Sequence, residues 1–296
     1  MILFFGDGRL GNQIFQYAFI RTAVKKKYTI ISYNFEDILE LFEDLPKVIN
    51  IQNKLYKFLI RSYVLPLLDF FARIKLITSY KVDSNLENGY VTEAVTYTKT
   101  NGFLPILYFY PCFAQSEVFF NKDLVKYFIL KENYLARAEK FLALIPNHFN
   151  KVFVHVRRGD YINHSVLGKR GVTLPISYFK NGIKWYENNI DNPFFVFLTD
   201  DPEYIENSFG DIQNKVISKN FMFVDFAIIT MCEYGIMSNS SFSWWAAYMM
   251  KSRKKVFSPR FWLGWKSEIE IPKGITSNFA DVLEVKINKS EVYSDL

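Results

Sequence analysis

The chain has 296 residues, of which 50% are hydrophobic, 18% are aromatic and 22% are charged. This composition excludes an intrinsically disordered chain and supplies enough apolar side chains for two ordinary domains or one large one. The net charge of +6 permits an acidic ligand, an anionic membrane surface or nucleic acid as a partner, without choosing among them.

The first half of the chain opens with a strand, a glycine-rich turn and a helix. Residues 2–5 have the apolar composition of a short strand, residues 6–13 form the turn, and apolar residues at helical spacing predict a helix that ends near Lys26. Such a turn presents backbone N–H groups and a helix N-terminus to a ligand. A plain tight turn explains the same residues at least as well, so the turn alone does not assign a function.

The rest of the first half is predicted to contain further strands and helices. Ser116 is a predicted N-cap, because a serine hydroxyl accepts hydrogen bonds from the first backbone N–H groups of a helix. The predicted elements are a strand over 28–33, mostly helix over 38–77 with a break near Pro66, a polar irregular segment over 78–105, a strand over 107–113 and helix over 124–144.

The second half alternates strands and helices more regularly, which predicts β-α-β units and a parallel sheet with right-handed crossovers. We therefore expect two α/β domains, an N-terminal one over residues 1–148 and a C-terminal one over residues 149–296. The predicted strands cover 152–156, 194–198, 216–217, 235–237 and 255–257, and the predicted helices cover 175–189, a short segment after Pro202, 225–233 and 241–250.

No stretch of the sequence has the length and apolarity expected of a membrane-spanning helix. The most hydrophobic region, residues 55–77, is interrupted by charged side chains and falls short of the ~18 mostly uncharged residues that a span needs. Ordinary helical packing is the favoured interpretation of this region; contact with an acceptor or with a membrane is the alternative. The N-terminus lacks the basic leader of a secretory signal, so we expect a cytoplasmic protein, soluble or peripheral to the inner membrane.

Polar residues follow three of the predicted strands of the second half. Arg157 and Arg158 follow the first of these strands, Asp200 follows the next, and the serine-rich turn Ser238–Ser241 follows a third. Ligands of open α/β sheets bind at the carboxyl ends of the strands. Three polar clusters at one edge therefore predict a ligand site more strongly than any one of them.

The two arginines favour a phosphorylated ligand. Guanidinium groups at the end of a buried strand need partners, because an unpaired charge away from water costs several kcal/mol. The planar forks of Arg157 and Arg158 suit a phosphate, which predicts an anion site. The alternative is an internal ion pair between Asp160 and one arginine.

Three other polar positions have a structural and a functional interpretation. The serines of Ser238–Ser241 either cap the following helix or, with its backbone N–H groups, bind a phosphate. Asp225 either caps the helix that it opens or accepts hydrogen bonds from the N–H groups of a base. For Asp200 and Asp201, which precede Pro202, initiation of a helix is the favoured interpretation.

No metal site and no disulfide are predicted. His148, His155 and His164 do not repeat at ligand spacing, and no acidic triplet suits a divalent ion on a sugar nucleotide. Cys112 and Cys232 lie far apart, which argues against a disulfide framework and fits a reducing compartment. A phosphate-binding P-loop motif is also absent. If a diphosphate leaves during the reaction, the arginines must stabilise its charge.

Three segments, in this order, resemble the motifs of one enzyme family. Gly8–Tyr17 (GRLGNQIFQY), His155–Tyr161 (HVRRGDY) and Asn239–Ala247 (NSSFSWWAA) are similar to motifs of the α-1,2-fucosyltransferases, glycosyltransferase family 11. Gln115–Glu117 also matches the family pattern, so the resemblance covers nearly the whole chain. It implies a GT-B fold, in which two Rossmann-like domains face each other across a cleft and the C-terminal domain holds most of the donor.

The resemblance also implies a reaction. The implied donor is GDP-β-L-fucose, the implied acceptor is the 2-hydroxyl of a terminal galactose in an oligosaccharide, and the fucose is transferred with inversion to give an α-1,2 linkage. The family needs no metal, and no cofactor is implied beyond the donor substrate. Nucleic acid is not an implied partner.

Residue roles follow from the same resemblance. The first arginine of the related fucosyltransferases contacts the GDP phosphates, which implies this role for Arg157 with Arg158 in support. Asp225 lies at the position of a guanine-binding acid. The other implied donor contacts are Gly11, Asn12, His155, Ser240 and Ser241, and the implied catalytic residues are Arg157, Arg158, Asp160 and Asn12.

The general base and two competing functions stay open at this stage. Asp160 is the acid nearest to the arginine motif, but orientation of an arginine is its favoured role, and Glu117 and Asp7 are the alternatives. One competing function is fucosyl transfer with another linkage. The other is a basic nucleic-acid-binding module, which would need the clusters at 25–27 and 253–255 to join a continuous stripe. No oligomeric state is predicted.

Overall fold

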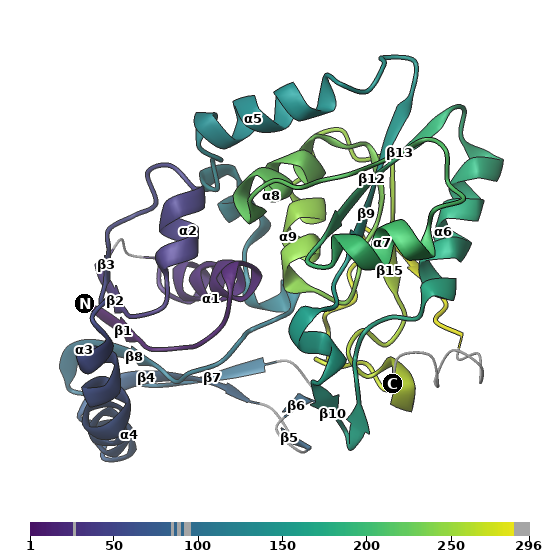
Figure 1. The fold of residues 1–296 in the computed structure, drawn as a ribbon. Coiled ribbons are helices and arrows are strands. Elements are labelled where there is room, and N and C mark those ends of the chain that lie inside the picture. Colours follow the sequence, from purple (N-terminus) through teal and green to yellow (C-terminus); the bar gives the residue numbers. More distant parts are fainter. Residues whose placement is uncertain (26–27, 84–85, 88–89, 92–95, 287–296) are drawn as a thin grey trace. The chain divides into compact units, whose positions relative to one another are not determined.

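The computed structural model describes residues 1–25, 28–83, 86–87, 90–91 and 96–286, and it divides into two compact units (Figure 1). Unit 1 comprises residues 1–85 and 93–131, and unit 2 comprises residues 86–92 and 132–296. The domain boundary expected after residue 148 lies inside unit 2, which already includes the preceding helix α5 (Glu132–Leu142). Helix α5 packs against helix α8 (Met222–Met231) of the same unit.

Unit 1 contains a six-stranded sheet in the order β3-β2-β1-β8-β4-β7. All neighbouring strands are parallel except β7, which runs antiparallel to β4 at the edge. The strands are β1 (Ile2–Phe4), β2 (Ile30–Ser32), β3 (Val48–Asn50), β4 (Ile77–Asp83), β7 (Thr96–Thr100) and β8 (Leu104–Phe109). The helices are α1 (Leu10–Ala23), α2 (Glu36–Leu41), α3 (Lys54–Leu59) and α4 (Leu65–Arg73), with the π-helical turn η1 (Ile60–Val64) between the last two.

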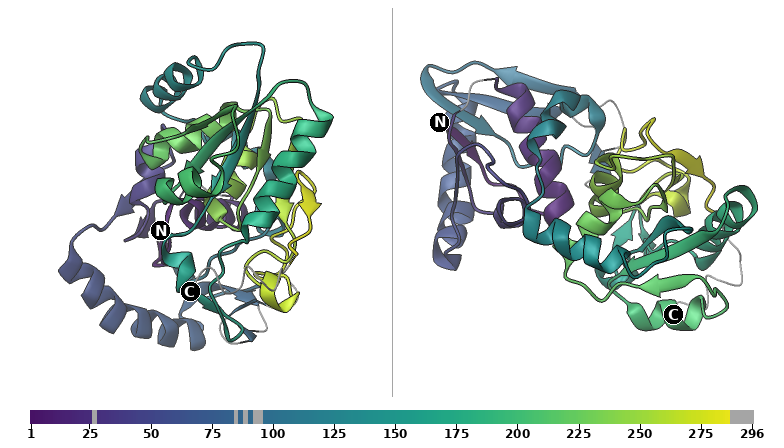
Figure 2. Two further views of the ribbon diagram at one scale, coloured as in Figure 1. Left: turned by 45° about the vertical axis from the view of Figure 1, so that its right-hand side comes forward. Right: turned by 90° about the horizontal axis from the view of Figure 1, so that it is seen from above.

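Helices cover both faces of the unit 1 sheet (Figure 2). Successive side chains of a strand point to opposite faces. Phe109 of β8 accordingly meets Phe19 of α1, with ring centroids 5.4 Å apart, while Tyr108 packs in a cluster with Leu68 of α4. The predicted helix after β1 is confirmed, and Ser116 is confirmed as an N-cap, here of the 3-10 turn η2 (Glu117–Phe119).

Two predictions for unit 1 are wrong. Residues 78–105 are not an irregular segment, because they hold most of β4, all of β7 and the start of β8. Strand β7 has an almost wholly exposed burial pattern at the sheet edge, so its polar composition resembles that of a loop. The helix predicted over 38–77 is interrupted by β3. Near Pro66 the chain stays helical, but the π-helical turn η1 ends two residues before this proline and α4 begins one residue before it.

Unit 2 contains a wholly parallel six-stranded sheet in the order β13-β12-β9-β14-β15-β16, which confirms the predicted parallel sheet. The strands are β9 (Asn150–Val156), β12 (Pro193–Thr199), β13 (Lys215–Ile217), β14 (Tyr234–Ile236), β15 (Lys255–Pro259) and β16 (Asp281–Leu283). Helices α6 (Ile176–Asn189), α7 (Pro202–Ser208), α8 and α9 (Ser241–Tyr248) connect them. The last strand and the short hairpin β10 (Ser165–Val166) with β11 (Lys169–Arg170) were not predicted.

The central strand β9 explains why this part of the sequence is so apolar. Val152, Phe153, Val154 and Val156 are all buried, because β9 lies between β12 and β14 and is covered on both faces. Both cysteines of the chain, Cys112 and Cys232, are free thiols.

Candidate active site

The polar clusters predicted at one sheet edge do lie on adjacent strands. In unit 2, Arg157 follows β9, Asp200 follows β12 and Ser238 follows β14 after one residue, and β9 lies between the other two strands. All three strands are parallel, so their carboxyl ends share one edge of the sheet. This edge is the candidate active site of unit 2.

Arg157 is held by two carboxylates. Its Nη1 lies 2.6 Å from Oδ2 of Asp200, and its Nη2 donates a hydrogen bond to Oδ1 of Asp160. The side chain of Asp160 is 54% exposed, whereas those of Arg157 and Asp200 are 18% and 26% exposed. The internal pair with Asp160 is therefore present, and it is joined by an acid that the sequence did not assign to this role.

Asp200 is fixed more firmly than Asp160. Its Oδ1 accepts a hydrogen bond of 2.9 Å from the backbone N–H of Arg158. Gly159 leaves room for it, since a Cβ at this glycine would lie 2.5 Å from Oδ2 of Asp200. Asp200 thus positions Arg157 from the inner side, while Asp160 occupies its solvent side.

Arg158 has a supporting geometry. Its guanidinium carbon lies 3.6 Å from the ring centroid of Tyr204, and its Nε lies 3.0 Å from Oδ2 of Asp201. The other carboxylate oxygen of Asp201 accepts from the backbone N–H of Tyr204 at 3.1 Å, so Asp201 is also the N-cap of α7. Helix initiation by Asp201 and Pro202 is confirmed. The ion pairs of Asp200 and Asp201 with the two arginines were not predicted. The available signal was the presence of two acids directly after the strand that follows the arginine strand in sequence.

His155 is a buried, neutral support for the serine turn. Its Nδ1 lies 2.7 Å from Oγ of Ser238, and its ring stacks on that of Phe242 with centroids 5.3 Å apart. Burial, together with the positive charge of Arg157, lowers the pKa of His155 to about 3. The imidazole therefore stays uncharged at neutral pH and connects β9 to the turn before α9.

The serine turn is held by side chains other than the serines predicted to bind a ligand. Ser243 Oγ donates to the backbone oxygens of Ser238 and Ser240, and Asn239 Nδ2 donates to the backbone oxygen of Val172 at 2.7 Å. Ser240 is the N-cap residue of α9, but its side chain makes no capping hydrogen bond. Its hydroxyl is therefore not used for the capping role that was the alternative to ligand binding.

Asp225 lies in a buried polar position near the end of β13. It belongs to the first turn of α8, and its carboxylate accepts a hydrogen bond from Oγ of Ser218, the residue that follows β13. Burial raises the pKa of Asp225 to about 7, and the hydrogen bond from Ser218 opposes only part of this shift. Phe226 packs edge-on against Phe242, which in turn stacks on His155, so aromatic rings connect this acid to the arginine strand.

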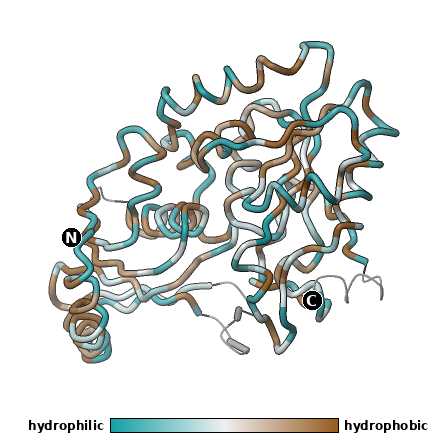
Figure 3. The backbone as a smooth tube through the Cα atoms, in the orientation of Figure 1, coloured by the Kyte–Doolittle hydropathy of each residue, from teal (hydrophilic) through white to brown (hydrophobic). Residues whose placement is uncertain are grey.

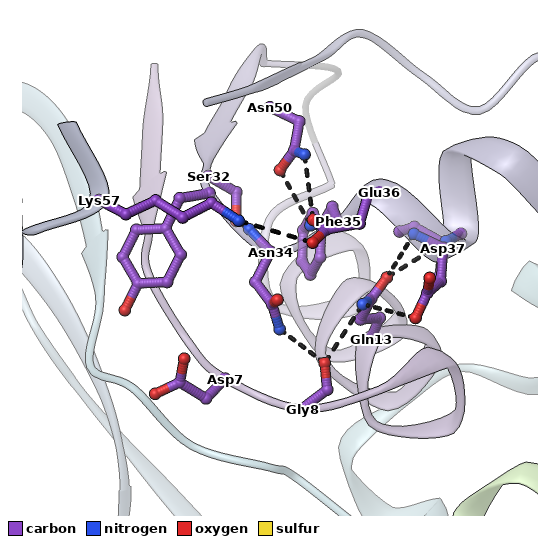
Figure 4. Close-up of polar contacts among 12 residues, drawn as sticks. Asp7, Gly8, Gln13, Ser32, Asn34, Phe35, Glu36, Asp37, Asn50 and Lys57 are labelled. Carbon is purple, nitrogen blue, oxygen red and sulfur yellow. Dashed lines mark hydrogen bonds and ion pairs between the residues drawn. The ribbon is translucent and has the colours of Figure 1, made fainter. Parts of the chain in front are cut away.

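The glycine-rich turn of unit 1 is fixed through its backbone. Gly8 has a φ of +127°, which side-chain-bearing residues rarely adopt, and a Cβ there would lie 2.6 Å from Cβ of Asn12. Its carbonyl accepts hydrogen bonds from Nδ2 of Asn34 at 2.6 Å and from Nε2 of Gln13 at 3.2 Å (Figure 4). Gln13 also accepts from the backbone N–H of Asp37, which connects the turn to α2.

Gly11 and Asn12 begin α1 directly after this turn. Gly11 is buried, and Asn12 Oδ1 accepts a hydrogen bond from Nε2 of Gln115, so two segments of the family motif meet in unit 1. Gln16 Nε2 donates to the backbone oxygens of Asp7 and Cys112. The two glutamines of the motif, Gln13 and Gln16, thus hold the turn in place.

The candidate bases Asp7 and Glu117, and two residues of one basic cluster, have ion-pair partners of their own. Asp7 pairs with Arg61, and Glu117 lies 3.3 Å from Nζ of Lys122. The basic cluster at 253–255 is also occupied: Lys254 pairs with Glu233, Lys255 pairs with Asp281, and Arg253 donates to backbone oxygens at the end of α9. Part of the cluster at 25–27 lies outside the described residues. Within the part of the chain that is described, no group of three or more His, Cys, Asp or Glu residues could hold a metal ion.

Comparison with known proteins identifies the family. Residues 5–257 match glycosyl transferase family 11. The chain belongs to this family. Its relatives include the O-antigen biosynthesis glycosyltransferase WbnK of Escherichia coli, 28% identical over 43% of this chain and 44% of that protein. Galactoside alpha-(1,2)-fucosyltransferase 2 of Gorilla gorilla gorilla is 29% identical over 47% of this chain and 43% of that protein. The chain thus spans less than half the length of these two relatives.

Three further comparisons support the family and the fold. An alpha-1,2-colitosyltransferase of Escherichia coli is 31% identical over 34% of this chain and 36% of that protein. The crystal structure of NodZ alpha-1,6-fucosyltransferase soaked with GDP-fucose has a TM-score of 0.52 at 10% identity, over 84% of this chain and 91% of that one. POFUT1 in complex with GDP-fucose has a TM-score of 0.51 at 15% identity, over 97% and 98% of the two chains. These likenesses confirm the predicted GT-B type of fold.

Proposed function

We propose that this family 11 glycosyltransferase transfers L-fucose from GDP-β-L-fucose to the 2-hydroxyl of a terminal galactose, with inversion, to form an α-1,2 linkage. The observation that carries the proposal is the geometry of Arg157 at the carboxyl end of β9, where a fixed carboxylate holds one nitrogen and an exposed carboxylate holds the other. The names of the relatives as α-1,2-transferases of fucose or colitose support this linkage. The solved NodZ and POFUT1 structures with GDP-fucose support the donor.

Donor binding in this proposal is an exchange of anions on Arg157. The diphosphate of the donor replaces the exposed carboxylate of Asp160, while Asp200 keeps the guanidinium in place. Hydrogen bonds between charged groups contribute about 1.5–3 kcal/mol each, and a diphosphate offers more acceptor oxygens than one carboxylate. Arg158 contributes indirectly. Its backbone N–H donates to Asp200 and its side chain pairs with Asp201, and both contacts hold the end of β9 in place.

The base of the nucleotide is proposed to bind at Asp225. Strands β13 and β9 are separated by β12, so the residues that follow them lie roughly 10 Å apart at about 4.8 Å per strand. A nucleoside diphosphate spans such a separation between its base and its phosphates. The carboxylate of Asp225 has only acceptor atoms when ionised, which suits the N–H groups of guanine.

The chemical step is proposed to be a single displacement. The acceptor hydroxyl attacks the fucosyl carbon opposite the departing GDP, and Arg157 with the Ser240–Ser241 turn stabilises the negative charge that develops on the diphosphate. Gly11 and Asn12 are proposed as further donor contacts from unit 1, on the resemblance of their motif. Asp160, Glu117 and Asp7 are the candidate general bases.

The test is a transfer assay with GDP-fucose against lactose and a panel of other galactosides, with linkage analysis of the product. The expected product carries fucose on the 2-hydroxyl of galactose. A product with another linkage would contradict the regiochemistry, and an enzyme that binds GDP without transferring fucose to any galactoside would contradict the acceptor class. Binding of oligonucleotides in preference to GDP would instead favour a nucleic-acid-binding module.

A further inference from the structure

A long exposed apolar stripe runs along the helices α3, η1 and α4. The three elements are continuous over residues 54–73, which gives a rod of about 30 Å at 1.5 Å per residue. Ile60, Leu68 and Ala72 face the core of unit 1 and are buried. The large apolar side chains that remain exposed on and directly after the rod are Leu55, Tyr56, Phe58, Leu59, Tyr63, Val64, Leu67, Phe70 and Ile74.

This stripe is unusual for a protein surface. Tyr63 is 68% exposed and Phe70 is 54% exposed, and large contiguous apolar patches on soluble proteins generally mark an interaction surface. Figure 3 shows hydrophobic colouring along much of the rod. Phe103, which is 89% exposed, extends the patch, because its backbone N–H donates to the carbonyl of Lys75 just beyond the end of α4.

The π-helical turn keeps the stripe on one face. From Leu55, steps of about 3.6 residues in a regular helix lead to Leu59 and then to polar, charged or helix-breaking residues. Those later positions are Ser62, Pro66, Asp69 and Arg73. The extra residue of the π turn moves the later positions by one, to Tyr63, Leu67, Phe70 and Ile74. A π turn at this place therefore aligns two apolar half-stripes into one, which a regular helix would not do.

The charges beside the stripe are almost all basic. Residues 54–75 contain five basic residues and one acid, Asp69, which accepts a hydrogen bond from the hydroxyl of Tyr108. Within the described part of the chain, Lys54, Arg73 and Lys75 make no ion pair and are exposed. They lie at the two ends of the rod, next to the apolar side chains.

We propose that this rod binds the surface of a bilayer rich in anionic phospholipid. An amphipathic helix with aromatic and aliphatic residues on one side and basic residues beside them lies in the plane of the interface, where its apolar side chains enter the acyl boundary. Lys54, Arg73 and Lys75 contact the anionic headgroups. Among the described residues no helix is long and apolar enough to cross a bilayer, so the contact is one of lying on the surface.

A second copy of the chain fits this surface less well. In a symmetric dimer the same face pairs with itself, so basic residues at both ends of one rod would meet basic residues of the other. Without acids on the stripe, such a pairing leaves these charges unneutralised. An anionic headgroup layer neutralises all of them, which is why lipid is the favoured occupant.

The experiment is sedimentation of the full chain with lipid vesicles. One set contains equal parts of phosphatidylglycerol and phosphatidylcholine, and the other contains phosphatidylcholine alone. The wild type is expected to bind the anionic set more strongly, with affinity that falls as salt rises. The variant Leu67→Glu/Phe70→Glu is expected to lose roughly tenfold or more of this affinity, because two charges then enter the apolar boundary.

The matched control is Ile129→Glu/Leu144→Glu, which makes the same charge change at two exposed apolar side chains that are not part of the rod and should bind like the wild type. A second variant, Lys54→Gln/Arg73→Gln/Lys75→Gln, keeps the stripe and should lose the preference for anionic vesicles. Equal binding by the stripe variant and its control, or no binding of the wild type to anionic vesicles, would overturn the proposal. A wild-type dimer that the stripe variant dissociates would also overturn it, in favour of a second copy. Fucosyl transfer to a soluble galactoside is independent of all these outcomes.

Discussion

The proposed donor site in unit 2 has a charged group at each end, Arg157 and Asp225, and the fold stabilises the two groups in opposite ways. At β9 the charge of Arg157 is neutralised before any ligand arrives, by Asp160 and Asp200. At α8 the acid Asp225 has a hydroxyl of Ser218 as its hydrogen-bond donor, and burial raises its pKa to about 7. At Arg157, ligand binding therefore exchanges one anion, a carboxylate, for another, the diphosphate. At Asp225, ligand binding supplies hydrogen-bond donors to a carboxylate whose ionised form is disfavoured by burial.

The largest effect is expected from Arg157→Lys. A lysine keeps the charge but cannot hold Asp200 and a diphosphate with separate nitrogens of one planar group. Turnover of GDP-fucose should fall roughly 100-fold, equivalent to about 2.7 kcal/mol of transition-state stabilisation. The measurement is kcat with a saturating galactoside. Arg260→Lys, at an exposed pair with Glu284, is the control and should keep full activity. Near-normal transfer by Arg157→Lys would remove this residue from the mechanism.

Asp225→Asn is expected to separate binding from stability. The pKa of Asp225 rises from 3.8 to about 7 on folding, so the native state binds the extra proton and the free energy of unfolding falls as pH rises from about 4 to about 7. The amide removes this penalty, and the variant should be more stable than the wild type at pH 8 by about 4 kcal/mol, at about 1.4 kcal/mol per pKa unit. Denaturant unfolding at pH 5 and pH 8 measures the difference, which should be much smaller at pH 5.

The same variant should bind GDP more weakly by roughly 10-fold or more, because one carboxylate oxygen that accepts from guanine becomes an amide donor. Wild-type affinity for GDP should also fall as pH drops below about 7, since the protonated acid no longer offers two acceptors. Calorimetry across pH 5.5–8.5 with Asp225→Asn as the pH-insensitive reference tests this. Unchanged GDP affinity in the variant would place the base elsewhere.

Gly159→Ala tests how firmly Asp200 must be fixed. The added methyl would meet Oδ2 of Asp200 at 2.5 Å, so the carboxylate must move away from Arg157. We expect about a 10-fold loss of kcat/KM, equivalent to about 1.4 kcal/mol, with little change in overall stability. Gly210→Ala is the comparison, because its φ is not positive and a Cβ there would meet only the backbone oxygen of Glu206, at 3.3 Å. Equal activity of both variants would show that Asp200 does not position the arginine.

The sequence predicted the edge of the unit 2 sheet because a buried parallel strand has a strong pattern. Val152, Val154 and Val156 make β9 apolar, and the change to Arg157 marks its end. The pairing of Arg157 with Asp200 was not predictable, because it depends on the register that sets Thr199 beside Val156. Register comes from tertiary packing, which a single sequence does not reveal.

Unit 1 was harder to predict because the edge strand of its sheet has little hydrophobic pattern. Strand β7 is exposed and polar, so it resembles a loop until it pairs with β4. The π turn η1 was not predictable, since a periodicity of 3.6 residues contains no signal for one inserted residue. The glycine turn was predicted, but its fixation by Gln13 and Gln16 depends on backbone groups that lie far away in sequence.

The smallest effect is expected from Asp160→Asn, and its sign distinguishes the two proposed roles of this acid. If Asp160 only occupies the solvent side of Arg157, its neutralisation removes a competitor for the diphosphate, and GDP should bind a few-fold more tightly, by about 0.5–1 kcal/mol. Turnover should then stay within a few-fold of the wild type. If Asp160 is the general base, GDP binding is again retained, but kcat falls by roughly 100-fold or more and the acidic limb of its pH profile disappears. Weaker binding of GDP would contradict the exchange itself, because a negative charge cannot compete with the diphosphate for Arg157 and also be needed for its binding.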